Sequence, residues 1–193
     1  MTVLPIIQLG APVLRHKAEV ISLEQLHSKE CQVFIDDMVA TMRAAHGAGL
    51  AANQVGSKLR ICVVEVQPNN PRYPYKPQIP LRIMVNPVVT PIGDAKFLNY
   101  EGCLSVPNLR GQVYRFQHVH LSYEDRHGVP HEEEVSGVTA GTYQHELDHL
   151  DGKVFVDRVH DTASLCTWEN FEDHYKADFT AYIIAMQKRL GLL

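Results

Sequence analysis

Residues 144–149 read Gln-His-Glu-Leu-Asp-His, and this stretch decides both the fold and the chemistry that we expect. His145 and His149 are four positions apart, so on a helix both imidazoles lie on one face and can reach one metal ion. Glu146 stands between them, where a general base is needed for a water that the ion activates. The stretch therefore predicts a helix over residues 138–150 and a metal-assisted attack of water on a carbonyl group.

The segments around this helix predict an α+β domain in which antiparallel sheets surround the central metal-motif helix. Apolar residues recur at helical spacing before and after the motif. Short stretches that are β-branched, or that alternate between apolar and polar residues, lie between the N-terminal helical segment and the motif. We expect an N-terminal helix over 24–46 that ends at Gly47, and a C-terminal helix over 166–190. The remaining expected features are strands over 59–66, 81–89, 113–124 and 132–135, a turn at 125–128, and Gly152 as the end of the metal-motif helix.

Prolines recur at every third position between the first two expected strands, at Pro68, Pro71, Pro74, Pro77 and Pro80. Polyproline II has three residues per turn, so these rings would line one edge of an extended loop over 68–80. We interpret the segment as an ordered surface loop, with a role in substrate access as the alternative.

Composition favours one compact domain over residues 1–193, because 45% of the residues are hydrophobic. The formal net charge is −4, with 18 basic and 22 acidic side chains and no basic block, so we expect no direct DNA binding. The N-terminus lacks the features of a secretory signal. The sequence contains no run of roughly 18 apolar residues, so we expect no membrane span. The four cysteines are widely spaced, which favours a reducing, cytoplasmic location.

A catalytic metal site normally takes three protein ligands and leaves one coordination position open, so the two histidines need a third partner. From His145 onward the chain follows the metzincin pattern up to Gly152, but Phe155 occupies the position of that pattern's third His and cannot bind metal. A downstream Glu, as in thermolysin-like enzymes, is offered by Glu169 or Glu172. A small metallopeptidase of that kind is the alternative function, although 193 residues leave little room for the two-lobed architecture of such enzymes.

Cys103 is the third candidate ligand, in the segment Glu101-Gly102-Cys103-Leu104-Ser105-Val106-Pro107. A lone cysteine is more often a buried small hydrophobe than a ligand. This one, however, lies in a Gly-flanked, Pro-terminated segment, which is an unusual place for simple core packing. A thiolate with two imidazoles gives a three-ligand set with an open fourth position. Spacing alone leaves the choice of ligand open.

Three ordered segments of the chain resemble the signature segments of peptide deformylases. They are Gly47-Ala48-Gly49-Leu50-Ala51-Ala52-Asn53-Gln54, Glu101-Gly102-Cys103-Leu104-Ser105 and Gln144-His145-Glu146-Leu147-Asp148-His149. The opening Ile6-Ile7-Gln8-Leu9-Gly10-Ala11-Pro12-Val13-Leu14-Arg15 also resembles the usual start of that family. The resemblance runs from about residue 4 to about residue 160, and residues 161–193 match nothing diagnostic.

The resemblance implies an enzyme that removes the formyl group from the N-terminal formyl-methionine of newly synthesised polypeptides and releases formate. It implies that Cys103, His145 and His149 bind the metal ion, with water as the fourth ligand. A soft thiolate with two imidazoles suits zinc or iron. In the family the physiological ion is usually Fe(II), and Zn(II), Ni(II) or Co(II) are able to occupy the site.

The resemblance also implies the catalytic groups. Glu146 would take the proton of the attacking water and pass it to the leaving amine. The tetrahedral oxyanion would be stabilised by the metal ion, by the side-chain amide of Gln54 and by the backbone N–H of Leu104. A donor of this kind typically contributes about 3 kcal/mol.

The substrate main chain would pair with the segment formed by Gly47, Ala48, Gly49 and Leu50, as an added strand does. Glycines in this segment allow the backbone to come close to a ligand. We assign supporting substrate contacts to Glu101 and Gly102 of the metal-binding segment and to Arg110, which matches a recurrent arginine of the family.

The pocket for the methionine side chain is expected to differ from that of typical family members. Val138, Gly141 and Thr142 match positions that help line this pocket. Large apolar residues are common there, whereas Gly141 and Thr142 are small, and Ala48 stands where the family more often has Ile or Val. We therefore expect a roomier or differently shaped pocket.

The partners implied by the resemblance are N-formylmethionyl nascent polypeptides, with a transient contact to the ribosome. No membrane partner is expected.

Overall fold

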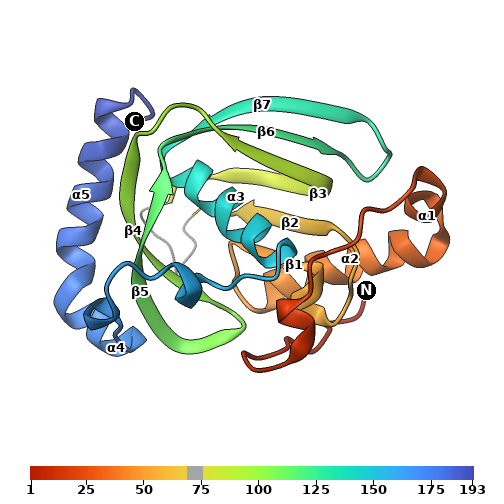
Figure 1. Ribbon diagram of the computed structural model, residues 1–193, viewed down its shortest axis with the longest axis horizontal. Coiled ribbons are helices and arrows are strands. Elements are labelled where there is room, and N and C mark those ends of the chain that lie inside the picture. The colour runs from red at the N-terminus through yellow and green to blue at the C-terminus, as the bar shows by residue number, and fades with distance from the viewer. Residues whose placement is uncertain (69–75) are drawn as a thin grey trace.

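The computed structural model describes residues 1–68 and 76–193 as an α+β fold of two antiparallel sheets around a central helix (Figure 1). The larger sheet has the strand order β1-β2-β3-β6-β7. Its strands are β1 (Gly49–Ala51), β2 (Ile61–Val66), β3 (Ile79–Pro91), β6 (His118–Glu124) and β7 (Pro130–Ser136). The smaller sheet pairs β4 (Lys96–Cys103) with β5 (Val106–Phe116). The predicted fold class is confirmed.

Helix α3 (Gly137–Leu150) lies at the centre and contacts strands of both sheets (Figure 1). Helix α2 (Lys29–Ala44) packs on β1 and β2, whereas α5 (Lys176–Arg189) packs on α3 from the side of β4 and β5. The predicted N-terminal and C-terminal helices are thus both present. Within the described ranges, no helix has both the length and the apolar character that crossing a bilayer would require.

The N-terminal helix predicted over 24–46 is interrupted, because Ser28 ends one helix and caps the next. It separates α1 (Leu23–His27) from α2, and its hydroxyl accepts a hydrogen bond from the Cys31 N–H at 3.2 Å. Side-chain oxygens of Ser satisfy the otherwise unpaired N–H groups at a helix start, so a new helix begins there. The buried apolar residues of α2 share one face and are Cys31, Ile35, Met38, Val39 and Met42.

The predicted stop at Gly47 is displaced, because α2 ends at Ala44. His46 takes the left-handed conformation with a φ of 50°, and the Gly47 N–H then donates to the Met42 carbonyl at 2.9 Å. At the end of α3, in contrast, Gly152 is the left-handed residue, with a φ of 73°. A Cβ there would lie 2.6 Å from the Arg15 carbonyl oxygen, so the glycine is required.

The strand predicted over 113–124 is wrong in one respect: it is two strands in different sheets, β5 and β6, that meet at Gln117. The Gln117 N–H donates to the Ala95 carbonyl at 2.8 Å, and its own carbonyl accepts from the Gly137 N–H at 2.8 Å. These bonds hold the residue outside both ladders. The alternation places Val113, Arg115, Gln117, Val119 and Leu121 on one side, and all of them except Gln117 are buried.

Other segments also differ from the predictions. Strand β4 was missed. The helix predicted over 166–190 begins with α4 (Trp168–Asn170), passes through a π-helical turn (Phe171–Tyr175) and continues as α5. Pro80, predicted to lie in the loop, is an exposed residue at the start of β3. Pro71 and Pro74 lie outside the described residues, so the polyproline interpretation of 68–80 stays a prediction.

Candidate metal centre and substrate cavity

The two histidines of α3 lie close to Cys103, which is the last residue of β4. The His145 and His149 rings lie 5.0 Å apart, and the Cys103 Sγ lies 3.2 Å from the His149 Nε2. The possible ligand atoms of the three residues all lie within 4.8 Å of one another. Among the residues that the structure describes, this is the only group of three or more that could hold a metal ion.

The competing ligands lie elsewhere. Phe155 is 1% exposed and packs in one apolar cluster with Cys103. Glu169 is exposed on α4, and Glu172 forms an ion pair with Lys176 on the neighbouring turn. Neither carboxylate belongs to the metal-binding group. Of the three candidates that the sequence left open, only Cys103 is in position.

A buried chain of charges orients His145. The Glu101 Oε2 accepts from the His145 Nδ1 at 2.9 Å, which leaves the Nε2 for a metal ion. Arg115 donates to both oxygens of Glu101, at 2.7 and 2.8 Å, and also to Asp148 at 2.6 Å. Asp148 is bound in turn by Arg158. Because each charge in this chain has a partner of opposite sign, the chain can be buried without leaving a charge unpaired.

The sequence predictions missed Arg115 and Asp148 as parts of the site. Arg115 is 3% exposed, whereas the sequence predictions placed it only within the strand predicted over 113–124. A charged residue in a row with Val113, Val119 and Leu121 is a signal for a buried partner, because an isolated buried charge is very costly. That signal could have found Arg115, although not its partners.

The neighbouring charges set the protonation of the metal-binding groups. Burial by itself would raise the pKa of the Cys103 thiol, but His149 and His145 lower it to about 5. Burial opposes the protonation of His145, yet the thiol and the Glu101 carboxylate raise its pKa well above the usual value. The pKa of Glu101 itself is lowered, because Arg115 and His145 outweigh the effect of burial. The thiolate, which is the metal-binding form of cysteine, is therefore favoured at neutral pH.

Glu146 is held in a closely packed, buried position beside the two histidines. It is 4% exposed, and its Oε2 has no hydrogen-bond partner among the described residues. Burial raises its pKa, and the nearby histidines partly offset that effect. A Cβ on Gly49 would lie 2.3 Å from the Glu146 Oε1, so only glycine fits at this position of β1. A buried carboxylate with a raised pKa, and with an oxygen that no described residue binds, is suited to exchange a proton with a reacting group.

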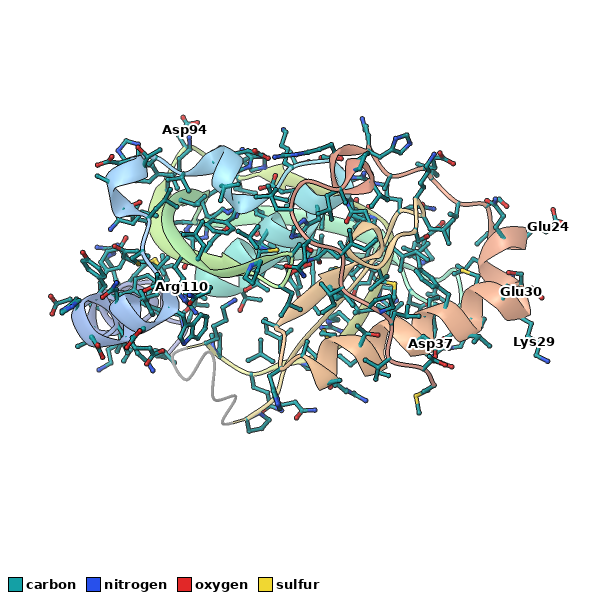
Figure 2. The ribbon with its side chains drawn as sticks, turned by 90° about the horizontal axis from the view of Figure 1, so that it is seen from below. Glu24, Lys29, Glu30, Asp37, Asp94 and Arg110 are labelled. Atoms are coloured by element: carbon teal, nitrogen blue, oxygen red, sulfur yellow. The ribbon has the colours of Figure 1, made fainter. Side chains whose placement is uncertain are left out.

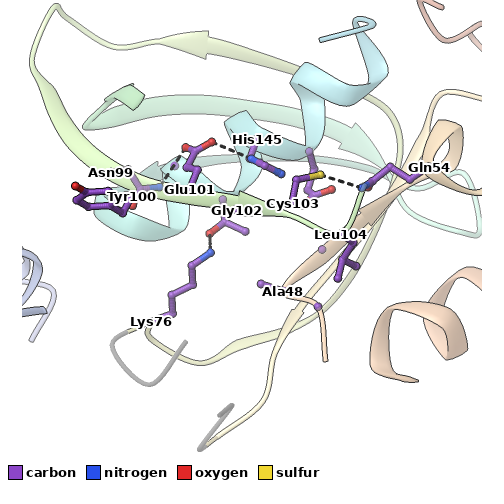
Figure 3. Close-up of a pocket in the computed structure, with 15 residues that line it drawn as sticks. Ala48, Gln54, Lys76, Asn99, Tyr100, Glu101, Gly102, Cys103, Leu104 and His145 are labelled. Carbon is purple, nitrogen blue, oxygen red and sulfur yellow. Dashed lines mark hydrogen bonds and ion pairs between the residues drawn. The ribbon is translucent and has the colours of Figure 1, made fainter. Parts of the chain in front are cut away.

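Gln54 faces Cys103 from the opposite side, and its side-chain amide is fixed at both ends. Its Oε1 accepts from the Ala51 N–H at 2.8 Å, and its Nε2 donates to the Ser105 Oγ at 3.1 Å and lies 3.4 Å from the Cys103 Sγ. The neighbouring Asn53 donates to the His149 carbonyl and ties this turn to α3. The Gln54 amide thus presents an N–H group next to the metal-binding sulfur (Figure 3).

One cavity joins these groups, and most of the predicted substrate-binding residues line it. They are Gly47, Ala48, Gly49, Glu101, Gly102, Gly141 and Thr142, together with the catalytic candidates Gln54, Leu104 and Glu146 and the metal ligands Cys103 and His145. Three other predicted residues are fully buried and do not belong to this lining. Leu50 packs in the core under α2, and Val138 packs in the core around α3.

Arg110 is the third residue outside the cavity lining. Its guanidinium lies 3.9 Å from the centre of the Trp168 ring and 4.3 Å from that of Phe171, beside the C-terminal helices (Figure 2). Its Nη1 donates to the Tyr100 carbonyl at 3.4 Å. This position makes Arg110 a structural support of β4 and of the C-terminal segment.

The cavity also has lining residues that the sequence predictions did not include: Lys76, Asn99 and Tyr100. The Lys76 Nζ donates to the Thr142 Oγ1 at 2.9 Å. The Gly141 position offers no extra room, because a Cβ there would lie 2.9 Å from the Phe97 Cζ. Of the two predicted forms, a roomier or a differently shaped pocket, extra room is not found at Gly141, where Phe97 takes the space.

Known proteins resemble this chain in sequence. The model of the family described as polypeptide deformylase matches residues 3–164. Peptide deformylase 2 of Nostoc sp. (strain PCC 7120) is 41% identical over 170 residues, which cover 88% of this chain and 93% of that protein. The peptide deformylase of Leptospira biflexa is 40% identical over 162 residues, which cover 84% of this chain and 90% of that protein.

Solved structures agree with the sequence comparison. A Met-Ala-Ser-bound crystal structure of the class I type b peptide deformylase from Acinetobacter baumannii has a TM-score of 0.78 and 39% identity, and the match covers 82% of this chain and 99% of that one. The peptide deformylase from Thermotoga maritima has a TM-score of 0.73 and 30% identity, with 83% and 100% of the two chains covered.

Proposed function

The chain belongs to the peptide deformylase family and is a metal-dependent hydrolase that removes the N-formyl group from newly synthesised polypeptides, and we propose which of its residues carry out that reaction. The observation that carries the proposal is the convergence of Cys103, His145 and His149 beside the buried carboxylate of Glu146.

Cys103, His145 and His149 are the residues that would hold the divalent ion. The low pKa of the Cys103 thiol and the hydrogen bond from the His145 Nδ1 to Glu101 both prepare these groups for an ion. When bound there, the ion supplies the Lewis acid that makes a water molecule nucleophilic near neutral pH. The soft thiolate supports Fe(II) as the physiological ion, with Zn(II), Ni(II) or Co(II) as possible substitutes.

Glu146 acts as general base and then as general acid. Its free Oε2 accepts a proton from the attacking water, and the same oxygen returns that proton to the amide nitrogen as the C–N bond breaks. The products are formate and a free N-terminal amine. The raised pKa of Glu146, caused by burial, suits a group that must take up a proton and then release it.

The side-chain amide of Gln54 and the backbone N–H of Leu104 donate to the oxygen of the formyl group as negative charge develops there. The hydrogen bond from the Ala51 N–H fixes the Gln54 amide before substrate arrives, so little reorganisation is needed during the reaction. Glu101 orients His145, and Arg115 orients Glu101.

The substrate enters as an extended peptide beside β1. This strand is at the edge of the larger sheet and carries Gly49 and Leu50, while Gly47 and Ala48 precede it. Edge strands bind extended peptides through main-chain hydrogen bonds. The Acinetobacter relative was solved with Met-Ala-Ser bound, and we propose that this chain binds peptides of that kind, with Gly102, Gly141 and Thr142 around the first side chain and Val138 and Arg110 in supporting positions.

The biological setting follows from this substrate. The partners would be formyl-methionyl nascent chains in the cytoplasm. The enzyme would bind these chains during a transient contact with the ribosome. Four free cysteines support a reducing compartment. We propose that residues 1–193 act together as a single catalytic domain, since α5 packs directly on α3.

The test is anaerobic purification followed by metal analysis and a deformylation assay on formyl-Met-Ala-Ser. Glu146→Ala should keep the metal and lower kcat by about 10²- to 10⁴-fold, because general acid–base catalysis contributes a factor of that size. The exposed Glu169→Ala is the matched control and should keep both metal and activity. Full activity of Glu146→Ala would refute the general-base role, and loss of metal from Glu169→Ala would favour the metallopeptidase alternative.

A further inference from the structure

The cavity ends in a group of polar side chains on the side away from Gln54 (Figure 3). Asn99 and Thr142 are 5% and 4% exposed, and Lys76 reaches Thr142 from the loop that precedes β3. The Lys76 Nζ donates to the Thr142 Oγ1 at 2.9 Å, and that hydroxyl donates in turn to the Val138 carbonyl at 3.1 Å. A positive charge is therefore fixed inside the substrate cavity by a buried hydroxyl.

Asn99 adds an acceptor that none of the described residues satisfies. Its Nδ2 donates to the Glu101 Oε1 at 3.2 Å, which sets the orientation of the amide. The opposite atom, Oδ1, is buried and has no hydrogen-bond partner within residues 1–68 and 76–193. A buried acceptor of this kind needs a ligand group or an ordered water. Asn99 and Thr142 both line the cavity that contains Cys103 and Glu146.

A thioether is a poor match for this end of the cavity. The sulfur of methionine is only a weak acceptor, so a methionine side chain placed here would remove water from the Lys76 ammonium without replacing its hydrogen bonds. It would do the same to the Asn99 carbonyl oxygen. Oxidation of the thioether to the sulfoxide gives a side chain of the same length that carries a polar oxygen. That oxygen can accept from Lys76 while a water remains on Asn99.

We propose that Lys76 is a specificity-determining residue and that this enzyme deformylates peptides whose first side chain ends in an acceptor oxygen, with N-formyl-methionine sulfoxide peptides as the substrate class. The inference rests on the proposed function, because the same metal centre and Glu146 carry out the hydrolysis. Water adds to the formyl carbon, the C–N bond breaks, and formate and the free amine leave. The sulfoxide is bound and not changed, so no reductant is needed.

The test compares three peptides on the metal-loaded enzyme: formyl-Met-Ala-Ser, its methionine sulfoxide form, and formyl-norleucine-Ala-Ser as the apolar isostere. For the wild type we expect kcat/KM to be highest for the sulfoxide and lowest for norleucine. Lys76→Met should lower the ratio of sulfoxide to thioether kcat/KM by about tenfold or more, because a hydrogen bond from a charged donor is lost. Lys76→Arg keeps a donor and should retain most of the preference.

A matched control removes a lysine that lies far from the cavity. Lys29→Met changes the exposed first residue of α2, at the far end of the molecule from the C-terminal helices, and should leave the ratio unchanged (Figure 2). A second readout needs no turnover: the product Met(O)-Ala-Ser should compete for the wild-type site better than Met-Ala-Ser does, and Lys76→Met should abolish that difference.

The outcomes separate this inference from the proposed function. If the wild type prefers the thioether and Lys76→Met leaves that preference unchanged, the role of Lys76 is refuted while the deformylase activity stands. If the loaded enzyme cleaves none of the three formyl peptides, the proposed function itself fails.

Discussion

The two ends of the substrate cavity are built in different ways. At the metal end, His145 is held by Glu101, Glu101 by Arg115, and Arg115 by Asp148, all with distances of 2.6 to 2.9 Å. At the far end, the Lys76 ammonium donates a hydrogen bond to the Thr142 hydroxyl. The side-chain oxygen of Asn99 has no partner among the described residues. The metal end is cross-linked between the two strands of the smaller sheet and α3, whereas the far end draws Lys76 from the loop that precedes β3.

We infer from this difference that the metal end carries out the reaction, whereas the far end distinguishes one substrate side chain from another. Catalytic groups must be placed before the substrate arrives, because preorganised charges and donors need not move as the reaction proceeds. The groups that choose a side chain need only a favourable contact with that side chain. A change at the metal end should therefore affect every substrate, whereas a change at the far end should affect some substrates more than others.

The largest effect on metal binding and activity is expected from removal of the Cys103 thiolate. Cys103→Ser should lose most bound metal and nearly all deformylation of any formyl peptide, because a hydroxyl does not ionise near neutral pH as this thiol does. Metal content per chain and the deformylation rate measure the effect. Cys166→Ser, at another free and partly buried cysteine, is the control and should keep both. Retention of stoichiometric metal in Cys103→Ser would show that another residue completes the ligand set.

A smaller effect is expected from breaking the chain of charges behind His145. Arg115→Met leaves Glu101 and Asp148 without a buried partner, which should lower the free energy of unfolding by about 3–5 kcal/mol. The metal affinity should also fall by about 10- to 100-fold, because the orientation of His145 is lost. Urea unfolding of the metal-free protein and chelator competition measure the two quantities.

The control for Arg115 is an ion pair on the surface. Arg43 pairs with Glu65 at 2.6 Å, but half of its side chain is exposed. Arg43→Met should cost less than about 1 kcal/mol of stability and leave the metal affinity unchanged. Equal losses of stability and metal affinity in Arg43→Met and Arg115→Met would mean that the buried chain of charges does not orient the metal ligands.

The same contrast between the two ends explains how much the sequence could predict. The metal end is encoded locally: the spacing of His145 and His149 is a helical period, and an ordered set of motifs added Cys103, Gln54 and Glu146. The helix, its end at Gly152 and the α+β class were predicted correctly, because periodicity and a left-handed glycine are short-range signals. The break at Gln117 was missed, because alternation continues across it although the chain changes sheets.

The far end could not be predicted, because no local pattern links its members. Lys76 follows a proline-rich segment, Asn99 lies in the missed strand β4, and Thr142 lies on α3. Only the fold brings the three to one cavity. Gly141 was expected to enlarge that cavity, and the distant residue Phe97 fills the space instead. Sequence therefore identified the chemistry of the site better than its selectivity.

The smallest expected effect comes from Thr142→Val, which preserves the shape of the far end and removes the hydroxyl that accepts from Lys76 and donates to the Val138 carbonyl. A single hydrogen bond of this kind contributes about 1 kcal/mol, so the sulfoxide preference should fall by about fivefold, less than in Lys76→Met. The metal content should not change, because among the described residues the Thr142 hydroxyl forms hydrogen bonds with Lys76 and Val138, and neither of these is a metal ligand. Thr139→Val, on the same helix beside a different hollow, is the control and should keep the preference. Equal loss of kcat/KM for all three peptides in Thr142→Val would mean that the two ends of the cavity are coupled, because a change at the selecting end would then have altered the chemistry.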